Sequence, residues 1–311
     1  MVIVGGATRL TDSGLSITEW KPLLGAIPPL NDLDWQSAFA KYQQIPEYKI
    51  QNKGMSLEDF KTIFWWEWGH RFLGRAIGFV FILPLGFFII TKRVRKSIWP
   101  RLLLLFVLGG FQGALGWYMV SSGLVDRIDV SQYRLAAHLT LAVALFAAVV
   151  WTALTLDRTI LNKPGRVMAI SFIATLFLQI AAGGFVAGLD AGYASDTWPL
   201  MDGAIVPSGL TTLQPPWRNF FENNLTVQFN HRLLAYGLLA LALVQVFRRR
   251  SLSSALVLVA VVGQLTIGIL TILYQVPFHV ALLHQGGALV VLTLALWHLS
   301  KLSRVPAPSQ R

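Results

Sequence analysis

Four histidines are the residues of this chain best suited to bind a metal, and they fall into two pairs that follow one another along the sequence. The first pair is His70 and His138, and the second is His231 and His284. Histidine is the commonest metal ligand in proteins, through a neutral ring nitrogen. Two copies of a two-histidine site therefore predict two bound metal ions or haems.

Cysteine is absent from the whole chain. The sequence thus excludes disulfides, iron–sulfur clusters held by thiolates, and covalent haem attachment through a Cys-x-x-Cys-His motif. Nitrogen or oxygen must hold any bound metal.

The composition indicates an all-α, polytopic membrane protein. Hydrophobic residues make up 54% of the chain, charged residues 13%, and the mean hydropathy is +0.56. A helix needs about 20 apolar residues to cross the roughly 30 Å of hydrocarbon in a bilayer. Stretches of that kind predict seven spans, at 72–91, 101–120, 135–156, 167–188, 232–247, 253–274 and 280–299.

An eighth span is suggested at the start of the chain but is too short. Only eight residues precede Arg9, so we interpret them as the end of a first helix and expect an in-frame start upstream. Nothing in the segment is typical of a cleavable signal.

Basic residues are concentrated in the short loops between alternate spans, which predicts that those loops are cytoplasmic. The net charge of +11 comes largely from clusters near 92–101, 158–166, 248–250 and 301–304. The C-terminus is then cytoplasmic, while 9–70 and 189–230 face the outer or periplasmic side. We expect the charge to meet acidic lipid headgroups rather than nucleic acid.

The chain contains an internal duplication. Gly5, Gly6, Asp12, Gly14 and Trp20 align without gaps, at an offset of 178, on Gly183, Gly184, Asp190, Gly192 and Trp198. The four histidines continue the alignment, as do Gln112 and Gln264 one span before the second histidine of each pair. We predict two tandem four-helix halves, 1–160 and 161–311, related by an axis along the membrane normal. All four histidines then lie near one membrane face.

The residues around the leading histidine of each half differ in one informative way. Arg71 and Arg232 follow the histidines and suit the propionates of a haem. Three residues before the histidine, however, the first half has Glu67 and the second has Gln228. A carboxylate can transfer protons or stabilise positive charge and an amide cannot, so the first half is the predicted place of chemistry.

Other polar residues have ordinary structural explanations. Gln112 and Gln264 are expected to form hydrogen bonds between helices, and His279 and His298 to be interfacial or solvated. An amphipathic patch from Trp35 to Tyr42 predicts a short helix in the first long outer loop.

These motifs, in this order and duplication, resemble heme A synthase. The resemblance is carried by Gly5-Gly6-Ala-Thr-Arg9, Glu67-Trp-Gly-His70-Arg71, Ala-Ala-His138, Asn230-His231-Arg232 and Leu-His284-Gln285, and it extends over essentially the whole chain. Because it has no cysteine, the chain resembles the cysteine-free branch of that family, which is typical of proteobacteria and mitochondria.

The resemblance implies a reaction and a division of labour. The methyl group of haem O is oxidised to the formyl group of haem A through a hydroxylated intermediate, in the bacterial inner membrane. His70, His138 and Arg71 would bind the substrate haem, with Glu67 as the catalytic carboxylate. His231, His284 and Arg232 would hold one b-type haem through which electrons leave. Expected partners are haem O synthase, cytochrome oxidase assembly factors and a redox partner of unknown identity.

Two other classes of protein remain open at this point. A di-haem b-type cytochrome for quinone-linked electron transfer needs the same histidines, but both haems must then be permanent. A transporter is compatible with the parallel repeat, although no pair of spans is broken by Gly or Pro in the way that a midplane site requires.

Overall fold

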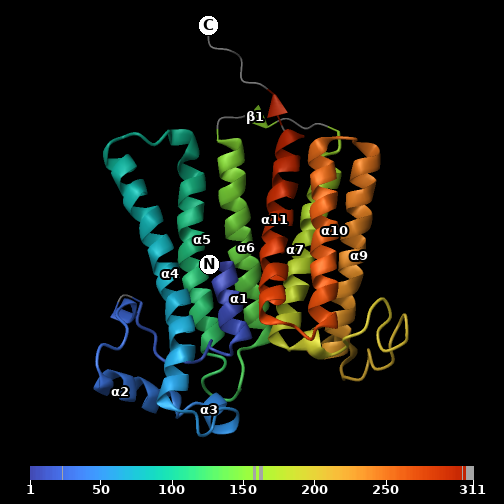
Figure 1. The fold of residues 1–311 in the computed structure, drawn as a ribbon. Helices are drawn as coiled ribbons and strands as arrows, with labels where there is room; N and C mark the ends of the chain where they lie inside the picture. The colour runs from blue at the N-terminus through green and yellow to red at the C-terminus, as the bar shows by residue number, and fades with distance from the viewer. Residues whose placement is uncertain (23, 157–158, 161–163, 303, 306–311) are drawn as a thin grey trace. The chain divides into compact units, whose positions relative to one another are not determined.

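The structure, a computed structural model, describes residues 1–22, 24–156, 159–160, 164–302 and 304–305, and these are almost entirely helical (Figure 1). The α-helices of the described residues are α1 (Val2–Leu10), α2 (Asp32–Tyr42), α3 (Pro46–Ile50), α4 (Leu57–Ile90), α5 (Trp99–Val120), α6 (Gln132–Thr155), α7 (Arg166–Gly188), α8 (Asn219–Glu222), α9 (Asn224–Arg248), α10 (Leu252–Leu273) and α11 (Phe278–Lys301). Single 3₁₀ turns lie at Leu24–Ala26, Lys96–Ile98, Ala191–Tyr193 and Pro216–Arg218. Two short strands, β1 (Thr159–Ile160) and β2 (Arg304–Val305), pair in antiparallel fashion.

Seven of the helices in the described part of the chain are long and apolar enough to cross a membrane, namely α4, α5, α6, α7, α9, α10 and α11. The prediction of an all-α polytopic membrane protein is confirmed. Two residues of the predicted basic loops, Arg158 and Lys163, lie outside the described residues. The start of the second predicted half, 161–163, lies outside them as well.

The first of these helices is longer than hydropathy predicts. α4 begins at Leu57, whereas the apolar stretch begins at 72, because Ser56 caps the helix by accepting a hydrogen bond from the amide of Asp59. At 1.5 Å per residue its 34 residues extend about 51 Å. The helix therefore reaches well beyond the roughly 30 Å of a bilayer core and carries Glu67 and His70 near its middle.

The chain forms two compact units, Met1–His138 and Leu139–Arg311. The division falls inside α6, and the predicted repeat boundary at 160/161 remains a prediction about sequence. In the first unit α4 packs against α1, α2 and α5. The predicted helix at Trp35–Tyr42 is α2, and its side chains join Phe60 and Phe64 of α4 in an aromatic cluster.

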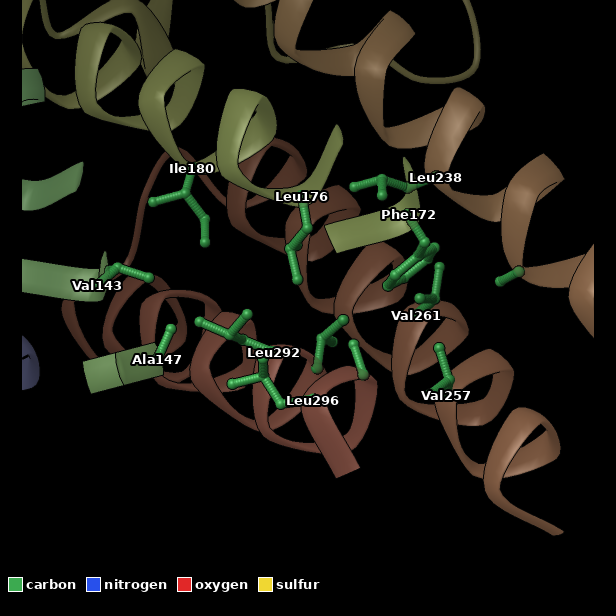
Figure 2. Close-up of a cluster of buried hydrophobic side chains, with 13 residues drawn as sticks. Val143, Ala147, Phe172, Leu176, Ile180, Leu238, Val257, Val261, Leu292 and Leu296 are labelled. Atoms are coloured by element: carbon green, nitrogen blue, oxygen red, sulfur yellow. The ribbon is translucent and has the colours of Figure 1, made fainter. Parts of the chain in front are cut away.

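In the second unit four helices form a closed bundle. α9 and α11 each pack against both α7 and α10, so α9 and α11 occupy opposite corners. The core consists of apolar side chains one helical turn apart, such as Phe172, Leu176 and Ile180 on α7 (Figure 2). Leu292 and Leu296 of α11 complete the same cluster. This core fixes the spacing of the helices that carry His231 and His284.

The duplication predicted from sequence is visible in the local backbone. Asp12, after α1, and Asp190, after α7, both adopt a left-handed conformation, with φ of 46° and 52°. Aspartate tolerates that region better than most residues. The loops that follow α1 and α7 thus turn at equivalent positions, back toward the next long helix of each half, α4 or α9.

Candidate haem sites

The second histidine pair lies across the bundle of the second unit. His231 is on α9 and His284 on α11, and the centres of their rings are 6.3 Å apart at an interplanar angle of 73°. Imidazole nitrogens lie about 2.0–2.1 Å from a metal such as zinc that they coordinate. The separation of the rings therefore leaves room for a single metal ion between them.

The first pair belongs to the first unit, with His70 on α4 and His138 near the start of α6. The two imidazoles are close enough to interact electrostatically. The structure thus brings each predicted pair together within one unit.

Every one of the four imidazoles lies against a glycine of another helix. A Cβ atom added to the glycine would lie 2.7–2.9 Å from the ring Cε1 in three of the four cases, closer than real Cβ contacts, and 3.2 Å from it at Gly183, which is tight. The pairs are Gly5 with His70, Gly116 with His138, Gly183 with His231, and Gly268 with His284. A side chain at Gly5, Gly116 or Gly268 would therefore have to displace the ring, whereas at Gly183 the ring would need to move by only a few tenths of an ångström.

Three of the imidazoles also contact a glutamine one helical turn before that glycine. The amide Nε2 of Gln112 lies 3.1 Å from His138 Nδ1, that of Gln179 lies 3.2 Å from His231 Nδ1, and that of Gln264 lies 3.2 Å from His284 Nδ1. The predicted interhelical hydrogen bonds of Gln112 and Gln264 are confirmed. Gln179 was missed, although the spacing Gln-x-x-x-Gly is common to all three helices.

Glu67 is 2% exposed and is held by the loop that follows α1 and by Arg71. Its carboxylate accepts hydrogen bonds from the Ser16 hydroxyl at 2.7 Å and the Ile17 amide at 2.6 Å, and it forms an ion pair with Arg71 at 2.5 Å. Arg71 also donates to the carbonyls of Ile17 and Glu19. The carboxylate and the guanidinium together fasten the loop to α4.

The second half uses the same positions with the opposite polarity. Gln228, also 2% exposed, donates through Nε2 to the carbonyls of Gly192 and Ser195 and accepts from Arg232. Arg232 donates in turn to the carbonyls of Ser195 and Thr197. Ser195 and Thr197 are the counterparts of Ile17 and Glu19 at the offset of 178. An amide can therefore hold this loop in place of a carboxylate.

The ligand set suits haem iron better than a bare ion. In the described part of the chain no group of three or more His, Asp or Glu side chains is placed to hold a metal. Structural and catalytic zinc sites use at least three protein ligands, whereas haem iron needs only axial ligands from the protein. Two facing imidazoles, each packed on a glycine, fit that second requirement.

The two remaining histidines do not belong to these pairs. His279 is exposed, as predicted. His298 is 3% exposed and its Nδ1 lies 2.8 Å from the Ser253 hydroxyl. The prediction of an interfacial or solvated His298 is therefore wrong, because serine at the start of α10 gives the ring a buried hydrogen-bond partner.

A second buried carboxyl lies in a short helix that precedes α4 in the first unit. Glu47 on α3 is 3% exposed, and its pKa is raised to about 8, chiefly by burial and further by the negative charges of Glu67, Asp12 and Asp129. The hydroxyl of Tyr42 hydrogen-bonds to it and works in the opposite direction. Glu47 therefore retains its proton at neutral pH.

Comparison with known proteins gives one family. The sequence matches the COX15-CtaA family, described as cytochrome oxidase assembly protein, over residues 1–296. Similar relatives include the heme A synthase of Parvibaculum lavamentivorans, 52% identical over 98% of this chain and 90% of the relative. Those of Mesorhizobium japonicum and Chelativorans sp. are 53% and 54% identical, each over 96% of this chain and over 85% and 86% of the relative.

The contact between glycine and imidazole predicts that one added methyl group displaces a ligand. Gly268→Ala should weaken haem retention in the second half, because overpacking costs about 1–3 kcal/mol, which corresponds to roughly 5- to 140-fold. Haem content after gel filtration measures the effect. Gly263→Ala is the matched control, since nothing lies within 4 Å of a Cβ at that position of the same helix; equal haem content in the two variants would contradict the contact.

The buried Glu47 predicts that stability falls as pH rises. The folded chain holds the proton up to a pKa of about 8, whereas the unfolded chain releases it near 4.5. The resulting loss in the free energy of unfolding is absent below about pH 4.5 and complete above about pH 8, and it amounts to at most about 5 kcal/mol. Glu47→Gln should flatten the dependence of thermal unfolding temperature on pH between 5 and 8.5. A variant with the slope of the parent would show that Glu47 is ionised in the folded protein.

Proposed function

The chain belongs to the heme A synthase family of cytochrome oxidase assembly proteins, and from this premise we propose that its two histidine pairs are a substrate site and a cofactor site in haem A biosynthesis. The protein is an oxidoreductase of the membrane whose substrate is haem O. A methyl group of haem O is oxidised to the formyl group of haem A through a hydroxylated intermediate. One observation carries the division into two sites, namely that four equivalent imidazoles are accompanied by a carboxylate in one half and by an amide in the other.

The second half is the proposed cofactor site. His231 and His284 would hold one b-type haem, which supplies a route for electrons leaving the substrate. Their positions at opposite corners of a closed bundle, with the apolar core beside them, favour permanent binding. Arg232 would assist through Nε, a buried donor with no hydrogen-bond partner among the described residues.

The first half is the proposed substrate site. His70 and His138 would bind the iron of haem O, and Arg71, the counterpart of Arg232, would stand at its edge. Glu67 lies one turn from His70 on α4 and is the buried carboxylate nearest to it in sequence. We assign to it the stabilisation of positive charge or the acceptance of a proton during oxidation of the methyl group.

The orientation in the membrane follows from charge. The basic residues of 92–101 and 248–250 lie in or next to the loops joining α4 to α5 and α9 to α10, which are cytoplasmic by the positive-inside rule. We infer a bacterial inner membrane protein with haem sites toward the periplasm and a cytoplasmic C-terminus. Haem O synthase and cytochrome oxidase assembly factors are the proposed partners, together with an unidentified redox partner. The repeat halves remain 1–160 and 161–311.

The role of Glu67 predicts that its amide variant is folded and inactive. Gln228 holds the equivalent loop as an amide, so Glu67→Gln should retain the second-half haem while losing most of its haem A production, about 10²-fold or more for a group in acid–base catalysis. Expression in a host that makes haem O but not haem A, followed by chromatography of extracted haems, measures it. Gln228→Glu, the reciprocal variant, is the control for a change of charge. Undiminished haem A from Glu67→Gln would remove Glu67 from the reaction.

The distinction from a di-haem cytochrome predicts unequal haem exchange. Protein carrying isotopically labelled b-type haem should keep that label at the His231/His284 site. Labelled haem O added at the His70/His138 site should instead be replaced when the protein is washed with excess unlabelled haem O. His284→Ala should abolish only the retained fraction and His138→Ala only the exchanging one. Two haems retained equally through the wash would support the electron-transfer cytochrome instead.

A further inference from the structure

Three glutamines inside the membrane-spanning helices are not used by the reaction as described so far. Gln112 on α5, Gln179 on α7 and Gln264 on α10 each place a carboxamide against the imidazole of another helix. Polar side chains within a bilayer are costly and usually functional. The three amides are therefore candidates for a role at the haem sites.

The contacts share the approach to Nδ1 and differ in detail, since the amide Nε2 of Gln112 and that of Gln179 also lie 3.3 and 3.1 Å from the ring Nε2 of His138 and His231. Gln112 and Gln264 donate, in addition, to the backbone carbonyls of His138 and His284, at 3.0 and 2.6 Å. In all three glutamines the amide oxygen Oε1 is buried and has no hydrogen-bond partner among the described residues. Each carboxamide thus retains one free acceptor beside a ring nitrogen.

An acceptor at that place has a specific use when a ring binds iron. A histidine that binds a metal through one nitrogen carries its proton on the other, and it usually donates that proton to a nearby oxygen. A carboxamide has both a donor and an acceptor, and half a turn about its terminal bond exchanges them, which in Gln112 and Gln264 gives up the hydrogen bond to the backbone carbonyl. The same side chain can therefore pair with the free ring and with the iron-bound ring.

The fourth imidazole lacks such a partner. His70 Nδ1 is buried and has no hydrogen-bond partner in the part of the chain that the structure describes. The offset of 178 that aligns Gly5 with Gly183 puts Met1 opposite Gln179. Methionine offers only a weak sulfur acceptor, so the position that orients His231 in the second half does not orient His70 in the first.

We propose that Gln112, Gln179 and Gln264 are positioning residues that fix His138, His231 and His284 as iron ligands, and that the unsupported His70 is the weakest of the four. This inference rests on the proposed function, because it presumes that the four imidazoles bind haem iron. It explains how one repeated ligand set serves a cofactor that stays and a substrate that leaves. The cofactor site has two supported ligands and the substrate site has one.

Haem transfer to excess apomyoglobin tests the proposal on the purified protein with its b-type haem. Gln179→Leu and Gln264→Leu should each speed the loss of that haem about 10- to 100-fold, the usual effect of removing a partner that orients a metal ligand. Gln179→Glu and Gln264→Glu should keep the haem and lower its reduction potential, since a carboxylate accepts the ring proton more strongly. Gln245→Leu is the matched control, because Gln245 is a buried amide of α9, 4% exposed, at the end away from His231.

The first site is tested with haem O as the added ligand. Gln112→Leu should weaken haem O binding by a similar factor without altering the retained b-type haem, and His138→Ala should weaken it more than His70→Ala. Electron paramagnetic resonance should show a larger high-spin fraction in Gln112→Leu. Equal effects of the two histidine variants, or a greater effect of His70→Ala, would overturn the ranking of the ligands.

Failure of this proposal and failure of the proposed function give different results. If His231→Ala and His284→Ala retain the b-type haem, the assignment of ligands is wrong. If those variants lose haem while Gln179→Leu and Gln264→Leu behave like Gln245→Leu in transfer rate and potential, the ligands stand and only the positioning role is overturned.

Discussion

The close contact between a glycine and the Cε1 atom of an imidazole is the constraint on which both sites depend. Helices in a membrane gain little from the hydrophobic effect when they associate, and small residues let them approach closely enough to pack. Here the small residue admits a ring instead of another backbone, as at Gly183 with His231. This contact limits how closely the two helices approach and confines the ring, so the glutamine one turn earlier acts on a ligand whose position is already restricted.

The duplicated loops show how equivalent positions can diverge without loss of the fold. Glu67 accepts hydrogen bonds from the backbone amide and hydroxyl of its loop, whereas Gln228 donates to loop carbonyls. The arginine one turn later makes the same carbonyl contacts in both halves. Because the arginine already secures the loop, the residue before it is free to be a carboxylate or an amide. The two halves can thus differ in chemistry at a position where their loops present groups of opposite polarity.

Much of this arrangement could be predicted from the sequence, and the omissions have physical reasons. The spans follow from the length of apolar runs, and the four histidines follow from their repetition. Gln179 was missed because a single amide in an apolar helix has no evident partner until the neighbouring helix is placed. The early start of α4 was missed because its first turns face an aromatic cluster of the preceding segment and have no apolar run. His298 was misassigned because its partner, Ser253, is distant in sequence.

Under the proposed function, the two halves meet opposite requirements with the same type of ligand. A cofactor site must bind indefinitely, but a synthase that bound its product as tightly as its cofactor would turn over once. The second half surrounds its histidines with a closed ring of helices and a core of buried aliphatic side chains. In the first half no residue of the most apolar stretch of α4 is buried, and the main cluster of buried side chains lies in the outer helices instead. In the first half the buried aromatic cluster therefore fastens the loop and the short helices to the start of α4, whereas the histidines of the second half lie beside a core to which all four helices of the bundle contribute.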